Sequence, residues 1–370
     1  MRSIFAFCKG EPVLSIAAFA ALLTCFFTPP SAAYIGYIDF RTLALLYALM
    51  VAVAVLRKSG ALDMAARKLY ASAGGARSLA LLLTALCFFS SMVLTNDVAL
   101  LTFVPFAALV LKLSGAEDLL LGVVVLQTLA ANLGSMLTPV GNPQNLYLYS
   151  YYNMSAGEFF AATAPATIAS GVLIAALVLF IPKKSIPVAY FADEVKLEKK
   201  GFALSLVLLA VSLATVFRLL DWQWMLAAVV ILLLVFDRAS LKDADFLLLL
   251  TFVCFFVFVG NLGEIELVRT VLEKVLAGRE LIVSALVSQV ISNVPAAVLL
   301  SGFTENAKAL LLGVDIGGLG TPVASLASLI SLRLYAKEPG SNTGRFLLVF
   351  SAANFALLVL LLAFAKIFLL

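Results

Sequence analysis

The chain contains no histidine and only four cysteines among its 370 residues. Histidine is the commonest metal ligand and the usual general base near neutral pH, so its absence argues against a metalloenzyme or a His-assisted hydrolase. The cysteines show no metal-ligand spacing, and three of them lie in apolar runs, where they are expected to pack as small core residues: Cys8, Cys25, Cys87 and Cys254. We expect no enzyme activity and no cofactor.

Charged residues are also scarce, at 12% of the chain. Hydrophobic residues make up 63%, against about 45–50% in soluble domains, and the mean hydropathy is +1.11. Apolar runs recur along the whole sequence, which predicts a polytopic all-α membrane protein in a lipid bilayer. The net charge of +4 comes from basic residues in short loops, where they report membrane orientation, so nucleic-acid binding is not expected.

Seven continuous apolar runs predict membrane helices. They lie near residues 13–28, 39–56, 159–181, 202–217, 222–236, 246–260 and 346–369. The first run could also be read as a cleaved signal peptide, but in a chain with many spans a retained helix is favoured. Two further spans, near 118–148 and 308–331, contain Gly/Thr/Pro breaks and are predicted to be broken helices. The total is about nine crossings.

Two segments, 79–111 and 279–304, fold an apolar run around an Asn motif and are predicted to be re-entrant hairpins. Segments near 59–72 and 264–277 mix charged and apolar residues, which is typical of helices along the membrane interface. The first half has two continuous spans before its hairpin and the second half has three. We therefore expect the first half to lack one helix, at its N-terminal end.

The charged stretch 183–200 is the linker between two halves, 1–182 and 201–370. With the N-terminus inside the cell, 18 of the 25 Lys and Arg residues fall on the cytoplasmic side. This is the direction that the positive-inside rule requires. It holds only if both hairpins leave on the side they entered, which makes the two halves inverted repeats in a cytoplasmic membrane.

The halves carry a doubled motif. Thr95-Asn96-Asp97 precedes a break that starts at Asn132, and Ser292-Asn293-Val294-Pro295 precedes a break that starts at Asp315. A constant offset of 183 residues relates the breaks, with three identical pairs: Gly134 and Gly317, Thr138 and Thr321, Pro139 and Pro322. Paired interruptions at matching places in two halves mark the binding site of a transporter.

Broken backbone survives inside a membrane only where it is buried in protein or lines a wet cavity. Helix N-termini that face such a cavity hold anions without Lys or Arg. Helix C-termini, freed carbonyls and Asn, Ser and Thr oxygens suit sodium. The doubled motif therefore predicts a site for a small anion or oxyanion beside a coupling ion, Na⁺ or H⁺.

Four residues lead the candidates. Asn96 and Asn293 are expected at the hairpin tips, where the alternative role is helix capping or packing. Asp97 and Asp315 are carboxylates at membrane depth, which favours coupling to Na⁺ or H⁺; the alternative is capping of a half-helix N-terminus. A sodium ion is expected near these four side chains.

Further candidates for substrate or ion binding come from the hairpin tips and the breaks: Thr95, Asn132, Gly134, Thr138, Pro139, Gly141, Asn142, Asn145, Ser292, Gly317, Thr321, Pro322 and Ser325. The polar stretch from Gly141 to Asn145 has only smaller side chains opposite it in the second half. Such unequal lining argues against a channel with equivalent ends, which is a further alternative.

At these motifs the chain resembles the ion-transporter superfamily, which includes arsenite permeases, NhaD-type sodium/proton antiporters, and citrate and dicarboxylate transporters. The resemblance covers the chain from about Asp39 onward. It implies a homodimer with a scaffold domain and a mobile domain of two hairpins and two broken helices. In the family the mobile domain carries substrate by an elevator-like motion, driven by sodium or protons.

One departure from the family pattern matters. The dicarboxylate branch has Ser-Asn-Thr at both hairpin tips, whereas this chain has Thr95-Asn96-Asp97 and Ser292-Asn293-Val294. The Asn-Asp pair leans toward arsenite permeases, so citrate-like and arsenite-like substrates both stay open. A sodium/proton antiporter is the nearest alternative function.

Overall fold

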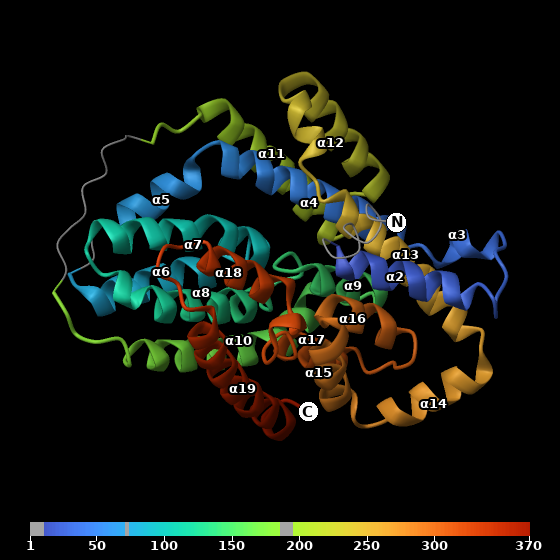
Figure 1. The fold of residues 1–370 in the computed structure, drawn as a ribbon. Helices are drawn as coiled ribbons and strands as arrows, with labels where there is room; N and C mark the ends of the chain where they lie inside the picture. Colours follow the sequence, from blue (N-terminus) through green and yellow to red (C-terminus); the bar gives the residue numbers. More distant parts are fainter. Residues whose placement is uncertain (1–10, 71–73, 186–194) are drawn as a thin grey trace, which may run out of the picture.

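The computed structural model describes residues 11–70, 74–185 and 195–370, and all regular structure in these residues is helical (Figure 1). The first half contains α2 (Pro12–Thr24), α3 (Ala33–Tyr37), α4 (Phe40–Lys58), α5 (Ala61–Tyr70), α6 (Ala76–Ser90), α7 (Asn96–Leu113), η1 (Glu117–Leu119), α8 (Leu120–Ser135), α9 (Pro143–Tyr151) and α10 (Ala156–Val178). Residues 186–194 of the expected linker, and Arg2, Cys8 and Lys9, lie outside the described residues.

The second half begins at Lys199, inside the segment expected to be a linker. It contains α11 (Lys199–Val216), α12 (Trp222–Phe236), η2 (Arg238–Lys242), α13 (Phe246–Gly263), α14 (Glu266–Leu276), α15 (Glu280–Ile291), α16 (Asn293–Ser301), α17 (Ala307–Ile316), η3 (Pro322–Ala324), α18 (Leu326–Ala336) and α19 (Thr343–Phe368). α5 and α14 are the two charged helices expected along the interface.

Seven helical stretches of the described chain are long and apolar enough to cross a membrane. Five match the expected continuous spans: α4, α10, α11, η2 with α13, and α19. The other two are α7 and η1 with α8. α2 and α12 have only 13 and 15 residues, short of the ~20 that a crossing needs. The polytopic all-helical class is confirmed, while the number of crossings and the re-entrance of the hairpins stay predictions.

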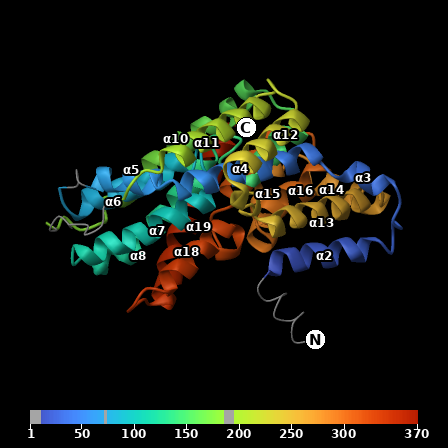
Figure 2. The same cartoon turned by 90° about the horizontal axis from the view of Figure 1, so that it is seen from above.

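Each Asn motif starts in the turn between two helices that pack together and continues into the first residues of the second helix. α6 and α7 pack on each other and on α8, and α15 and α16 pack on each other and on α17. Figure 2 shows α7 beside α8 and α15 beside α16. The first turn has five residues, 91–95, whereas the second has one, Ser292. Ser292 takes φ +74°, a backbone region that side chains other than Gly, Asn and Asp seldom adopt.

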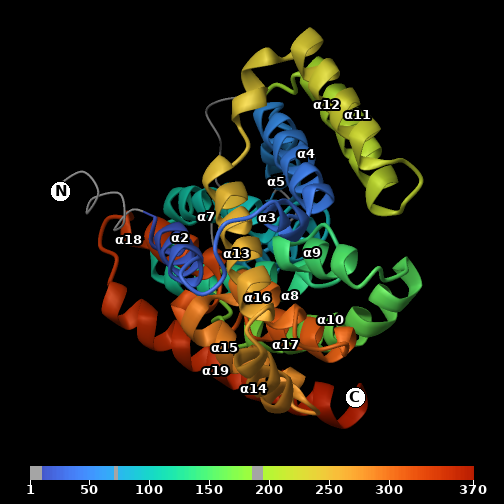
Figure 3. The same cartoon turned by 90° about the vertical axis from the view of Figure 1, so that its right-hand side faces the viewer.

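The helices before the two hairpins pair across the halves. α4 packs on α11 and α12, while α13 packs on α2 and α3. If α4 corresponds to α13, then α2 corresponds to α11, and the five-residue α3 stands where the counterpart of α12 would be. The helix missing from the first half is therefore the middle one, not the N-terminal one as expected. Figure 3 shows α11 and α12 projecting together beside α4.

Two apolar cores fill the molecule. One gathers buried residues of α6, α7, α8, α18 and α19, and the other gathers those of α4, α9, α11, α13 and α16. The first broken helix thus has α8 in one core and α9 in the other. α17 contributes to both cores, through Ile316 and Val314 respectively. The breaks consequently lie along the seam between the cores.

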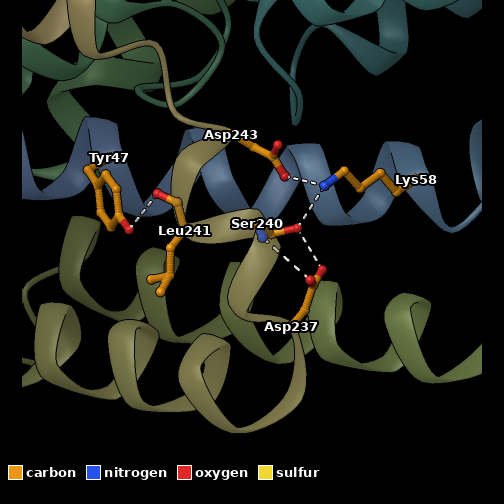
Figure 4. A network of polar contacts seen from close by, with 6 residues as sticks. All are labelled: Tyr47, Lys58, Asp237, Ser240, Leu241 and Asp243. Atoms are coloured by element: carbon orange, nitrogen blue, oxygen red, sulfur yellow. Dashed lines mark hydrogen bonds and ion pairs between the residues drawn. The ribbon is translucent and has the colours of Figure 1, made fainter.

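A polar network fastens η2 to α4 (Figure 4). Lys58 pairs with Asp243 and donates to Ser240 Oγ at 3.0 Å, and Tyr47 donates to the Leu241 carbonyl at 3.3 Å. The Lys58 side chain is 52% exposed, so the ion pair contributes at most about 1 kcal/mol. Its effect is positional, because it holds the start of α13 against α4.

We predict that Gly260→Ala destabilises the protein. A Cβ at this position of α13 would lie 2.3 Å from Tyr37 Cγ of α3. Overpacking of this kind lowers the free energy of unfolding by about 1–3 kcal/mol. Gly263→Ala is the control, since a Cβ there has no heavy atom within 4 Å. Thermal unfolding in detergent checks this, and equal midpoints for the two variants would contradict it.

Candidate functional site

The first break, between α8 and α9, is held by one amide side chain. Asn145 Nδ2 donates toward the carbonyls of Met136 and Thr138 at 3.3 and 3.2 Å. The Asn145 backbone amide in turn donates to Asn142 Oδ1 at 2.9 Å, which caps α9. Freed carbonyls need such partners inside a membrane. Asn145 therefore has a structural role, beside the binding role predicted for it.

The second break, between α17 and α18, is held by a different amide. Gln289 Nε2 donates to the carbonyls of Gly317 and Leu319 at 2.8 and 2.9 Å. Its Oε1 accepts from the Thr321 backbone amide at 2.9 Å. The sequence analysis missed Gln289. The signal was available, because it is the one amide side chain in the apolar stretch 281–291.

The identical threonines tie each break to its own hairpin. Thr138 Oγ1 donates to the Met92 carbonyl, and Thr321 Oγ1 donates to the Gln289 carbonyl at 3.0 Å. Met92 and Gln289 occupy equivalent places, each four residues before the Asn of its hairpin tip. The conserved geometry in both halves makes these threonines positioning residues.

The glycines of the doubled motif permit close approach of the hairpins. A Cβ on Gly134 would lie 2.2 Å from the Phe88 carbonyl oxygen, and one on Gly317 would lie 2.8 Å from Ala285 Cα. Phe88 and Ala285 are again equivalent positions of the two hairpins. A Cβ on Gly141 would lie 2.0 Å from its own break, at the Ser135 oxygen. These three glycines shape the site sterically.

Asn132 connects the first hairpin tip to the second broken helix. Its Oδ1 accepts from Asn96 Nδ2 at 3.2 Å and from Ser325 Oγ at 3.0 Å. Its Nδ2 donates to Ser328 Oγ at 3.3 Å. All four side chains are buried. Asn96, Asn132 and Ser325, predicted separately, thus meet in one cluster across the two halves.

Asp315 makes the reciprocal contact. Its Oδ1 accepts from Asn142 Nδ2 at 3.4 Å and from Gln144 Nε2 at 3.3 Å. The side chain is 2% exposed, and Oδ2 is buried without a hydrogen-bond partner among the described residues. Asp315 lies at the C-terminal end of α17, so the alternative that it caps a half-helix N-terminus is wrong.

Asp97 lies apart from that cluster, in the first turn of α7. Together with Thr95 and Asn142 it lines a cavity of about 640 Å³. Its Oδ1 is buried and has no hydrogen bond within the described chain. The backbone amide of Asp97 bonds to Asn96 Oδ1 at 2.9 Å. The carboxylate therefore does not cap its helix through a hydrogen bond.

The remaining candidates are at the second tip and in the breaks. Asn293 is 5% exposed and makes no side-chain hydrogen bond among the described residues. Ser292 Oγ donates to the Ala324 carbonyl at 3.3 Å. Pro322 begins η3, whereas Pro139 lies in the first break between α8 and α9. Gln144 and Ser328 belong to the reciprocal contacts although they were absent from the candidate set.

Comparison with known proteins decides the family. The family model described as citrate transporter matches residues 4–309. The chain belongs to the citrate transporter family. This confirms the resemblance to the ion-transporter superfamily, and together with the apolar helices it makes the chain a multi-pass membrane transporter.

Individual relatives agree with this family. The chain is 33% identical to an uncharacterized transporter of Methanocaldococcus jannaschii over 335 residues, which cover 90% of each chain. It is 29% identical to the inner membrane protein YbiR of Escherichia coli over 88% of each chain. A shorter match, 32% over 133 residues, joins it to the silicon efflux transporter LSI3 of Oryza sativa subsp. japonica, covering 36% of this chain and 27% of that protein.

We predict that Gln289→Leu lowers stability strongly, because it leaves backbone groups of the second break without partners. Each such group costs about 1–3 kcal/mol. Met92→Leu at the equivalent position is the matched control, and a swap of similar volume costs less than about 1.5 kcal/mol. Thermal unfolding of both variants in detergent measures the difference. A Gln289→Leu midpoint equal to that of Met92→Leu would refute the role assigned to Gln289.

Proposed function

We propose that this transporter is an ion-coupled secondary carrier of a small anion or oxyanion. The reciprocal contact of the two broken helices carries the proposal: Asn132 bonds Ser325 of the other half, and Asp315 bonds Asn142. The offset of 183 residues makes Asn132 equivalent to Asp315 and Asn142 equivalent to Ser325. Two inverted elements that meet at one point provide a site that either side of the membrane can reach in turn.

Helix termini supply the anion-binding groups. α7, α9, α16 and α18 begin at the hairpin tips and breaks. First-turn amides carry partial positive charge, although the Asp97 and Asn145 amides already bond to Asn96 and Asn142. The segments 92–101, 128–148, 289–301 and 309–331 contain no Lys or Arg. An anion held there is bound by backbone amides and by the amides of Asn96 and Asn293.

Asp315 supplies the charge for a coupling cation. Its unpartnered Oδ2 is an oxygen ligand without a donor, at the C-terminal end of α17, where the helix dipole is negative. Sodium or a proton at this oxygen neutralises a buried charge that is costly when left alone. Cation and anion are then bound within one connected set of side chains, which couples them.

The packing of the hairpins and broken helices also bears on how the transporter moves. We propose that the hairpins and broken helices move past the remaining helices in an elevator-like motion, in a homodimer within the cytoplasmic membrane. The packing of these elements supports this: each hairpin packs on the broken helix of its own half, and α7 also packs on α18 of the other half. The N-terminus is proposed to be cytoplasmic, since 18 of 25 basic residues then fall inside.

Ligand screening tests the substrate class. Citrate, dicarboxylates, sulfate, phosphate and arsenite are added to purified protein with and without sodium, and thermal unfolding is followed. A ligand at 100 times its Kd stabilises the folded state by about 2.7 kcal/mol. We expect one anion to raise the midpoint more in sodium than without it, or at lower pH if protons are coupled. No shift with any of them would count against an anion carrier.

Asp315→Asn is predicted to abolish cation-dependent transport. Proteoliposomes with the identified anion are assayed with a sodium gradient and, separately, with a pH gradient. The variant keeps the size of the side chain and the oxygen that accepts from Asn142 and Gln144 but removes the charge, so uptake should no longer respond to either gradient. Glu305→Gln is the control, since Glu305 is an exposed acid of the same half. Full coupling in Asp315→Asn would overturn the assignment.

A sodium/proton antiporter is the alternative function, and one observation favours it. Asp97 is a second carboxylate with an unpartnered oxygen, and it faces a cavity. An antiporter changes the internal pH of vesicles on addition of sodium, without any transported anion. Loss of this change in Asp97→Asn would establish the alternative. A normal change after removal of both Asp97 and Asp315 charges would eliminate it.

A further inference from the structure

The cavity that Asp97 faces lies between α4 and the first break. It has a volume of about 640 Å³, with walls from α4, α7, α9, α13 and α18. Most of the lining is apolar, as at Leu49, Val53 and Leu101. The ionisable lining residues are Arg57, Lys58, Asp63, Asp97, Asp243 and Asp245. These charged side chains therefore lie beside apolar walls, where the dielectric constant is low.

The charge of this cavity is negative. Lys58 pairs with Asp243, so these two charges cancel. The remaining charged residues of the lining are three acids and one base: Asp63, Asp97, Asp245 and Arg57. Arg57 has no ion pair among the described residues. A net negative lining within apolar walls focuses the field and raises the local concentration of cations. The cavity therefore attracts cations.

The cavity is connected through Asn142 to Asp315, the residue proposed to bind the coupling cation. Asn142 lines the cavity and also donates to Asp315 Oδ1. Asp97 lines the same wall, with its Oδ1 buried and unpartnered in the described chain. Asn142 thus links the cavity to Asp315, because it shares the cavity lining with Asp97 and donates to Asp315.

We propose that this cavity is a cation-selective vestibule that delivers the coupling ion to Asp315, and that Asp245 determines its selectivity. The proposal rests on the proposed function, since it assumes a cation site at Asp315. Asp245 is exposed and caps α13 by accepting from the Leu248 amide at 2.9 Å. The bond fixes this carboxylate at the cavity wall, where the network of Lys58 and Tyr47 holds α13 against α4.

Thiol labelling tests the vestibule without any transport assay. In a chain whose native cysteines are replaced, Ala54→Cys in the cavity wall is reacted in detergent with a trimethylammonium and a sulfonate methanethiosulfonate. Gly157→Cys is the control, because it is exposed and its Cβ has open space. We expect the cationic reagent to be favoured at Ala54→Cys by roughly tenfold relative to the control. Equal preferences at both positions would overturn the proposal.

The ratio of the labelling rates with the cationic and the anionic reagent is measured again in two variants, Asp245→Asn and Asp63→Asn. Asn caps a helix as well as Asp does, so the first variant removes the charge but keeps the start of α13. The preference for the cationic reagent should fall toward the control value, most strongly for Asp245→Asn. The difference should also shrink as salt is raised, because the field is screened. An unchanged ratio in Asp245→Asn would remove its assigned role.

Transport then separates this proposal from the function on which it rests. In proteoliposomes, Asp245→Asn should raise the cation concentration for half-maximal uptake severalfold and leave the rate at saturating cation unchanged. Sodium and pH are varied separately to identify the cation. If Asp315→Asn abolishes coupling while Asp245→Asn has no effect, only the vestibule is refuted. If Asp315→Asn stays coupled, the proposed function itself fails.

Discussion

The structure depends on the reciprocal contact of the two broken helices at the centre of the molecule. Asn132 contacts Ser325 and Ser328, and Asp315 contacts Asn142 and Gln144. Each contact joins the end of one half-helix to the start of a half-helix in the other repeat. Neither break is stable in lipid, since its backbone groups need partners. Asn145 and Gln289 supply these partners within each half, and the contact between the halves brings the two breaks together at one point.

The equivalence of the two contacts is geometric, but their charges differ. Asn132 is neutral and Asp315 carries a carboxylate at the same repeat position. The neutral member is fully bonded to hydroxyls and an amide, whereas the acidic member keeps one oxygen free. The two halves are thus alike in geometry at this point but differ in the charge of the equivalent side chain. One half supplies scaffolding at this crossing, and the other supplies the charge proposed to couple transport.

Much of this arrangement could be predicted from the sequence, since hydropathy marks the helices and Gly, Pro and Asn mark the breaks. The repeat offset was enough to identify Thr138 and Thr321 as equivalent residues. It did not predict that each would donate a hydrogen bond to its hairpin. Three features could not be predicted. Gln289 supports its break from α15, the short α3 stands in the place that α12 has in the second half, and the partners of Asp315 come from the other half. Each depends on tertiary contacts that periodicity does not encode.

The two hairpin turns differ in length, with five residues in the first and only Ser292 in the second. The five-residue turn has more backbone dihedral angles to adjust, although Thr138 holds it at the Met92 carbonyl. A single residue held at φ +74° has almost none. We expect one face of the carrier to be mechanically compliant and the other stiff. We therefore expect the two hairpin tips to exchange a bound ligand at different rates.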